Sequence, residues 1–165
     1  MDIYAVKING LDNPLGFDYD VLLCSWKVRE SRGKKQISTK IQVALDESIT
    51  KITWEKEGNL NSLGEPLDFM LQPYTRYYYQ ITVTSDVGEV ARSEVCWFET
   101  AKLDDPWQAK WIGVQKEDRH PELSKTFYAD DVKLCRLYIC GLGIFEAYIN
   151  GQKAGNDLLA PFIND

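Results

Sequence analysis

Residues 77–84 alternate strictly between two sets of side chains, and this alternation constrains the fold more than any other stretch of the sequence. Alternate positions of an extended strand share one face, here Tyr77, Tyr79, Ile81 and Val83. The opposite face would carry Tyr78, Gln80, Thr82 and Thr84. A period of two over eight residues predicts a strand with one buried face.

Short segments rich in β-forming residues recur on both sides of this strand, with Gly, Asn, Asp and Pro between them. Helical periodicity is nearly absent, so we predict an all-β fold whose strand spacing is typical of a sandwich. The predicted strands are Ile3–Ile8, Val21–Val28, Thr39–Leu45, Ile49–Glu55, Tyr77–Thr84 and Glu94–Thr100.

A polar segment closed by a proline, from Ala101 to Pro106, predicts a linker between two parts of the chain. We therefore expect a first β-sandwich domain over residues 1–102 and a second, incomplete β domain, with the linker, over residues 103–165. Two strands are predicted in the second part, Arg136–Cys140 and Ile144–Ile149. The second runs into Asn150 and Gly151, a strong hairpin signal.

The charge balance excludes some classes of partner. A net charge of −6 disfavours nucleic acid, because phosphate binding relies on clustered Lys and Arg. The one basic run, Arg32, Lys34, Lys35 and Lys40, is expected to be a solvated hairpin edge. No stretch is apolar and long enough for a membrane span, and the N-terminus lacks the pattern of a secretory signal, so a cytoplasmic location is expected.

The four cysteines, Cys24, Cys96, Cys135 and Cys140, form no CxxC pair, and one histidine accompanies them. We therefore predict no metal site and no cofactor. Reduced, buried thiols are expected. A sandwich would let Cys24 and Cys96 point inward from different sheets, but a disulfide is not expected in a reducing compartment.

The segment around the clearest strand resembles a fibronectin type III domain. It carries Leu71, Pro73, Thr75 and Tyr77 in a Leu-x-Pro-x-Thr-x-Tyr pattern, and the last predicted strand ends in Phe98-x-Thr100. The resemblance implies that Tyr77 is a tyrosine corner, with its ring in the core and its hydroxyl bonded to an upstream backbone group. It also implies that Trp26 is a core tryptophan.

The order of motifs along nearly the whole chain is similar to the N-terminal region of bacterial α-L-rhamnosidases of glycoside hydrolase family 78. After Phe98 and Thr100 the motifs are Trp107 with Ala109 and Trp111-Ile112, Gly141-Leu142-Gly143, Asn150-Gly151 and Ala160-Pro161. The segment from Pro161 to Asp165 departs from the Pro-Gly-Trp-Thr-Asp-like segment frequent in the family. The resemblance implies a fibronectin-like, immunoglobulin-like sandwich followed by part of a jelly-roll-like sandwich.

The resemblance also implies a non-catalytic accessory role. In the family, carboxylic acids on a downstream helical barrel hydrolyse terminal α-L-rhamnose, and this chain is expected to contribute no catalytic residue. Its expected partners are the downstream catalytic domain of the same parent chain and, through the parent, rhamnose-containing carbohydrate. Two alternatives remain: a carbohydrate-binding module, and a structural scaffold of fibronectin type.

Several residue types typical of active sites occur singly or in pairs. The acidic pairs Asp104-Asp105, Glu117-Asp118 and Asp130-Asp131 are expected to be solvated loop residues, and His120 a surface histidine. Gly141-Leu142-Gly143 is expected to be a bend between strands. Trp107 and Trp111 are the candidate carbohydrate contacts, although their place beside the linker favours anchoring one domain on the next.

The incomplete second domain also predicts self-association. Strands after residue 103 without partners would leave apolar faces and strand edges uncovered. We therefore expect the chain to dimerise or exchange strands through this region.

Overall fold

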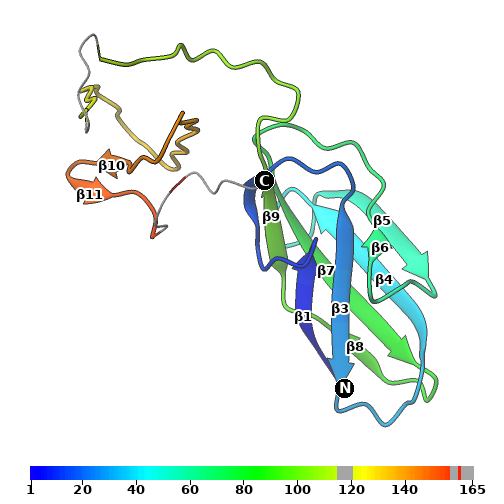
Figure 1. The fold of residues 1–165 in the computed structure, drawn as a ribbon. Coiled ribbons are helices and arrows are strands. Elements are labelled where there is room, and N and C mark those ends of the chain that lie inside the picture. Colours follow the sequence, from blue (N-terminus) through cyan, green and yellow to red (C-terminus); the bar gives the residue numbers. More distant parts are fainter. Residues whose placement is uncertain (115–120, 157–159, 161–165) are drawn as a thin grey trace. The chain divides into compact units, whose positions relative to one another are not determined.

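The computed structural model describes residues 1–114, 121–156 and 160. The described residues contain no helix, and their strands number β1 to β11 (Figure 1). The all-β fold predicted from the sequence is confirmed. The chain divides into two units, Met1–Trp111 and Ile112–Asp165, and each is described by itself.

The first unit is a sandwich of two sheets (Figure 1). One sheet has the strand order β1-β3-β6, with β1 Asp2–Ile8, β3 Leu23–Arg29 and β6 Glu65–Pro66. The other has the order β2-β9-β7-β4-β5, and β8 also pairs with β7. Its strands are β2 Leu15–Phe17, β4 Gln36–Ala44, β5 Ile52–Gly58, β7 Arg76–Ser85, β8 Val90–Arg92 and β9 Cys96–Thr100.

β7 lies at the centre of the larger sheet and alternates between half-buried and buried residues along its whole length. Its buried positions are those that the sequence period predicts. Cross-strand pairs such as Ile41 with Ile81 and Val43 with Tyr79 place apolar side chains of β4 beside them. The tight pairing of β4, β7 and β9 thus builds one wall of the core.

Large aromatic side chains fill the space between the sheets. Trp26 on β3 is 2 % exposed, and its indole Nε1 donates to Gln36 Oε1 at 3.1 Å. The rings of Tyr77 and Phe98 stack with centroids 5.2 Å apart. The predicted core position of Trp26 is confirmed.

All six strands predicted in this unit are present, and the bounds of each differ from the predicted ones by one to three residues at one or both ends. The predicted strand Ile49–Glu55 corresponds to β5, which begins at Ile52 rather than at Ile49, because the carboxylate of Asp46 accepts hydrogen bonds from Thr50 and Lys51 and holds a turn there. Ile49 has φ 53° in this turn. The short strands β2, β6 and β8 carry too few residues for a visible period, and the sequence did not predict them.

The second unit contains a hairpin of β10 Tyr148–Ile149 and β11 Gln152–Lys153, and an isolated bridge between Phe145 and Ala160. Asn150 and Gly151 between the strands have φ 50° and 78°, as a type I′ turn requires. The predicted hairpin turn is confirmed, but the strand before it is Tyr148–Ile149 rather than the predicted Ile144–Ile149. The predicted strand Arg136–Cys140 is wrong, because no described residue forms a ladder with it.

Candidate functional site

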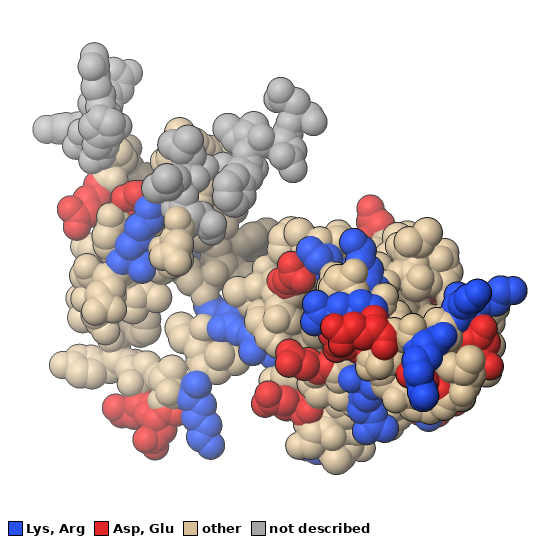
Figure 2. All heavy atoms as spheres, turned by 90° about the horizontal axis from the view of Figure 1, so that it is seen from below, with Lys and Arg blue, Asp and Glu red and all other residues tan. Residues whose placement is uncertain are grey.

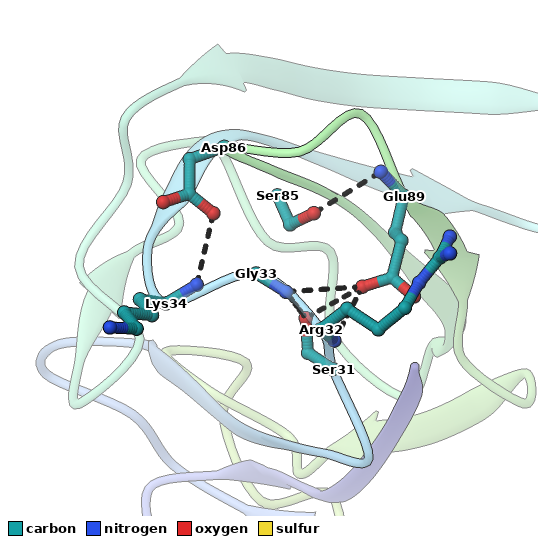
Figure 3. Close-up of polar contacts among 7 residues, drawn as sticks. All are labelled: Ser31, Arg32, Gly33, Lys34, Ser85, Asp86 and Glu89. Carbon is teal, nitrogen blue, oxygen red and sulfur yellow. Dashed lines mark hydrogen bonds and ion pairs between the residues drawn. The ribbon is translucent and has the colours of Figure 1, made fainter.

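The sandwich has a polar cluster at the end that carries the β3–β4 and β7–β8 loops (Figure 3). The carboxylate of Glu89 accepts three hydrogen bonds through Oε2, from Ser31 Oγ at 3.0 Å, Arg32 N at 2.8 Å and Gly33 N at 3.3 Å. Its Oε1 accepts from Arg32 Nε at 3.0 Å. These contacts, with the Arg32 side chain first, lower the pKa of Glu89 from 4.5 to about 2.

A second carboxylate completes this loop latch, which comprises Ser31–Lys35 and Ser85–Glu89. Asp86 Oδ1 accepts from Lys34 N at 2.9 Å, and Asp86 N donates to Lys35 O at 2.9 Å. Gly33 lies so close to Ser85 that an added Cβ would stand 2.6 Å from the Ser85 Cβ. The latch therefore joins two loops whose residues are more than fifty positions apart, and its role is structural.

The basic run falls in and beside the latch. Arg32, Lys34 and Lys35 are exposed, as predicted, and Lys40 is half-buried on β4. The ion pair of Arg32 with Glu89 was not foreseen. Figure 2 shows basic and acidic side chains interspersed over this face of the sandwich unit, so the run creates no large field of one sign.

The tyrosine corner lies toward the other end of β7. Tyr77 is 2 % exposed, and its hydroxyl accepts a hydrogen bond from Gln72 N at 2.8 Å. Thr100 Oγ1 donates to Gln72 O at 2.7 Å and accepts from Thr75 N at 2.9 Å. The role that the resemblance implied for Tyr77 is confirmed, and the same corner holds the end of β9.

The start of the linker is bonded to this corner. Ala101 N donates to Phe17 O at 3.0 Å, and Ala101 O accepts from Tyr74 N at 2.9 Å. Leu103 N donates to Asp18 Oδ1 at 3.1 Å. The ammonium of Lys102 donates to the carbonyl oxygens of Leu103 and Asp105, at 2.8 Å each. The direction in which the chain leaves the sandwich is therefore set by the sandwich itself.

The bonded residues 101–105 form the linker anchor. A groove of about 760 Å³ lies beside it. Three segments line it: Asp18–Leu22 after β2, Pro66–Leu71 after β6, and Leu103 with Asp104 in the linker. No sequence pattern pointed to it, since its walls come from three separate loops.

The candidate carbohydrate contacts lie in an irregular segment after the anchor. The side chains of Trp107 and Trp111 are 49 % and 70 % exposed, and neither lies in a strand. Their roles as sugar contacts or domain anchors remain predictions. A different tryptophan, Trp97 on β9, has the guanidinium of Arg76 4.0 Å above its ring, and Arg76 also pairs with the buried Glu99 at 2.9 Å.

The other candidate residues are not brought together. Asp104 and Asp130-Asp131 are exposed, as expected of loop carboxylates, whereas Glu117-Asp118 and His120 lie outside the described residues. Gly141-Leu142-Gly143 forms a bend. Over the described ranges, no three His, Cys, Asp or Glu side chains are close enough to hold a metal ion, and no helix could cross a membrane.

The cysteines are all reduced in the structure. Cys24 is fully buried, and this burial raises the pKa of its thiol to about 12. Burial also raises the pKa of Cys96, which is half-buried, while Cys135 and Cys140 are exposed. All four thiols are free, as expected. The expected burial holds for Cys24, in part for Cys96, and not for Cys135 and Cys140.

The hairpin of the second unit carries a polar cluster that the sequence analysis missed. Glu146 accepts from the Tyr148 hydroxyl at 2.8 Å and from the Lys153 ammonium at 2.6 Å. These hydrogen bonds, with that of Lys153 first, lower the pKa of Glu146. All three side chains lie on or beside one hairpin, so the cluster stabilises that hairpin.

Comparisons with known protein families match two parts of the chain. Residues 3–104 match the family described as "Rha78A-like, N-terminal immunoglobulin domain". Residues 130–165 match the family described as "Alpha-L-rhamnosidase N-terminal domain".

The curated relatives are long proteins. Two α-L-rhamnosidases of Formosa agariphila are 26 % and 27 % identical to 98 % and 92 % of this chain. An α-L-rhamnosidase of an Alteromonas species is 25 % identical over 92 % of the chain. The chain spans about a fifth of the length of these relatives, 21 % of the first and 19 % of the other two.

Two solved structures are similar in fold. The α-L-rhamnosidase of Streptomyces avermitilis, complexed with L-rhamnose, superposes with a TM-score of 0.60 at 23 % identity, covering 68 % of this chain and 12 % of that one. The α-L-rhamnosidase of Dictyoglumus thermophilum gives a TM-score of 0.59 at 26 % identity, covering 71 % and 14 %.

Proposed function

Since this chain belongs to the family of Rha78A-like N-terminal immunoglobulin domains, we propose that it is the non-catalytic N-terminal part of an enzyme that hydrolyses terminal α-L-rhamnose. The observation that carries the proposal is the order of the two family matches, an immunoglobulin-like domain followed by the start of a rhamnosidase N-terminal domain. Relatives that are five times longer supply room for a catalytic domain elsewhere in the parent protein.

The proposed role of the sandwich is to orient its neighbours. Ala101 and Leu103 donate hydrogen bonds to Phe17 O and Asp18 Oδ1, and Tyr74 N donates one to Ala101 O. These bonds fix the first linker residues, which supports a defined exit direction for the chain. The most buried carboxylates of the unit are engaged in ion pairs, Glu65 with Lys56 at 2.9 Å and Glu99 with Arg76. Such pairing suits a structural role, whereas an acid and base for glycoside hydrolysis must face a substrate.

The second unit is proposed to be completed by other parts of the parent protein. It exposes large apolar side chains, among them Phe127, Tyr128, Leu134, Leu142 and Ile144, each at least 65 % exposed. The exposure of so many large apolar side chains in one unit favours cover by other protein surface. In the isolated chain, we propose that a second copy provides that cover by dimerisation or strand exchange.

Hydrolysis of a chromogenic α-L-rhamnoside tests the proposed function. The 165-residue chain and the protein made from the complete open reading frame would be assayed at equal molar concentration. We expect hydrolysis by the longer protein and none by the 165-residue chain. No hydrolysis by either protein, with L-rhamnose binding by the 165-residue chain, would replace the proposal with a carbohydrate-binding module.

A further inference from the structure

The groove beside the linker has an apolar floor and an exposed apolar rim. Leu22 and Leu67 in the floor are 5 % and 4 % exposed. On the rim, Met70 is 84 % exposed and Val21 is 57 % exposed. A methionine so exposed between the half-buried Phe69 and Leu71 adapts well to a partner, because its side chain is unbranched and polarisable.

The polar groups of the groove are almost all carboxylates. Asp18, Asp20, Asp68 and Asp104 line it, together with Tyr19, and no Lys, Arg, Asn or Gln among the described residues does. Asp18 is used by the linker. In the described part of the chain, Asp20, Asp68 and Asp104 form no hydrogen bond or ion pair, although the charge of Asp68 is one of the causes that raise the pKa of Lys56.

Such a lining favours a cationic partner. Ionised carboxylates only accept hydrogen bonds, whereas Lys and Arg only donate them. A sugar hydroxyl both donates and accepts, and the hydroxyl of Tyr19 is the one donor among the described side chains that line the groove, so the lining suits a cation better than a sugar. A second copy of the same face would bring like charges together, which opposes a symmetric dimer through the groove.

The position of the groove indicates where that partner comes from. One wall is formed by Leu103 and Asp104, in the turn closed by the hydrogen bond from Asp105 N to Lys102 O at 3.0 Å. The groove thus lies where the chain leaves the sandwich. About four fifths of the length of the relatives lies outside the region that this chain matches.

We propose that the groove is the docking site for a segment of the parent protein, outside these 165 residues, that presents an apolar side chain next to a Lys or Arg. This inference rests on the proposed function in one respect, that the chain is part of a longer protein. The apolar side chain covers Met70 and Val21, and the cation pairs with Asp20, Asp68 or Asp104. The contact would fix the sandwich to the rest of the enzyme.

Oxidative footprinting of Met70 tests the docking. Exposed methionine is converted readily to its sulfoxide, and cover by protein slows the reaction. The oxidation rate of Met70 would be measured by mass spectrometry in the 165-residue chain and in the protein from the complete open reading frame. We expect roughly tenfold slower oxidation in the longer protein. Equal rates would overturn the proposal.

Two further outcomes would assign the groove to another occupant. Protection of Met70 in the 165-residue chain by added L-rhamnose would make the groove a sugar site. Protection that rises with the concentration of the 165-residue chain would make it an interface between copies. The rhamnosidase assay is separate, so an inactive longer protein with a protected Met70 refutes the proposed activity and leaves the docking intact.

Charge reversal in the longer protein tests the cation. Asp68→Lys removes a carboxylate of the groove, and the matched control Glu30→Lys makes the same change in charge at an exposed residue beyond β3. We expect Asp68→Lys to restore fast oxidation of Met70 and Glu30→Lys to leave it protected. Equal protection in both variants would show that charge does not contribute. Both variants of the 165-residue chain should keep the same urea midpoint, because neither residue is buried.

Discussion

The hydroxyl of Tyr77 accepts a hydrogen bond of 2.8 Å from the backbone N–H of Gln72, five residues earlier in the chain. The bond joins the loop before β7 to the core, since the Tyr77 ring stacks on Phe98. Thr100, at the end of β9, donates a hydrogen bond to Gln72 O and accepts one from Thr75 N, so the same corner also holds β9. The corner therefore connects the core with the point from which the linker departs.

Replacement of Tyr77 by Phe should remove this bond and keep the ring. We expect the free energy of unfolding to fall by about 1 kcal/mol, because the Gln72 N–H loses its partner. Urea denaturation followed by tryptophan fluorescence measures the change. The matched control is Tyr78→Phe, at a half-buried position on the opposite face of β7, and its stability should stay within about 0.5 kcal/mol. An equal loss of unfolding free energy in both variants would contradict the assignment of Tyr77 as a tyrosine corner.

The hydrogen bonds of Glu89 in the loop latch predict that the stability of the chain depends on pH. The pKa of Glu89 is lowered from 4.5 to about 2, so its contribution is fully present above pH 4.5, declines below that and is lost as the pH falls through about 2. Glu89→Gln should lower the urea midpoint above pH 4.5, and its difference from the unmodified chain should shrink at lower pH. Glu94→Gln, at an exposed position, is the control. A pH-independent difference would refute the charge-assisted latch.

The close approach of Gly33 to Ser85 and Asp86 in the same latch predicts that a larger residue at position 33 lowers stability. In Gly33→Ala the new Cβ would meet the Ser85 Cβ and the Asp86 carboxylate at 2.6 Å, so the loops must separate at a cost of about 1–3 kcal/mol. Thermal unfolding measures this loss. Gly113→Ala serves as the control, because nothing lies within 4 Å of its added Cβ. Unchanged stability of Gly33→Ala would show that the two loops are not held in contact.

The thiols should differ in reactivity according to burial. Cys135 and Cys140 are exposed and should alkylate first with iodoacetamide at mildly alkaline pH, because the thiolate is the reactive form. Cys24, with its pKa raised to about 12, should react after denaturation. Peptide mapping by mass spectrometry assigns each site. Rapid alkylation of Cys24 in the folded chain would contradict the packed core around β3.

The exposed apolar side chains of the second unit predict self-association of the 165-residue chain. Light scattering coupled to size exclusion should show a mass that rises with concentration. Phe127→Ser and Leu134→Ser remove side chains that are 72 % and 67 % exposed and should reduce the mass toward that of a monomer. The control Leu63→Ser, at an 88 % exposed position of the first unit, should not. A monomer at all concentrations would exclude self-association.

Local sequence patterns predicted the central strand and the Asn150-Gly151 turn, and the fibronectin resemblance implied the tyrosine corner and the core position of Trp26. Each depends on residues that are neighbours in the chain: a period of two, a motif of seven residues, or two turn residues with positive φ. The family resemblance also rests on the order of such short motifs. These features needed no knowledge of which strands would meet.

The contacts of the loop latch, the walls of the groove and the strand pairing within the second unit depend on the tertiary structure and could not be predicted from the sequence. Glu89 is more than fifty residues from the loop it holds, and nothing in the sequence distinguishes it from the other acidic residues. The groove needs three loops whose proximity follows from the sandwich. The apolar segment Arg136–Cys140 has the composition of a strand, yet a strand exists only where a neighbouring backbone completes its ladder of hydrogen bonds.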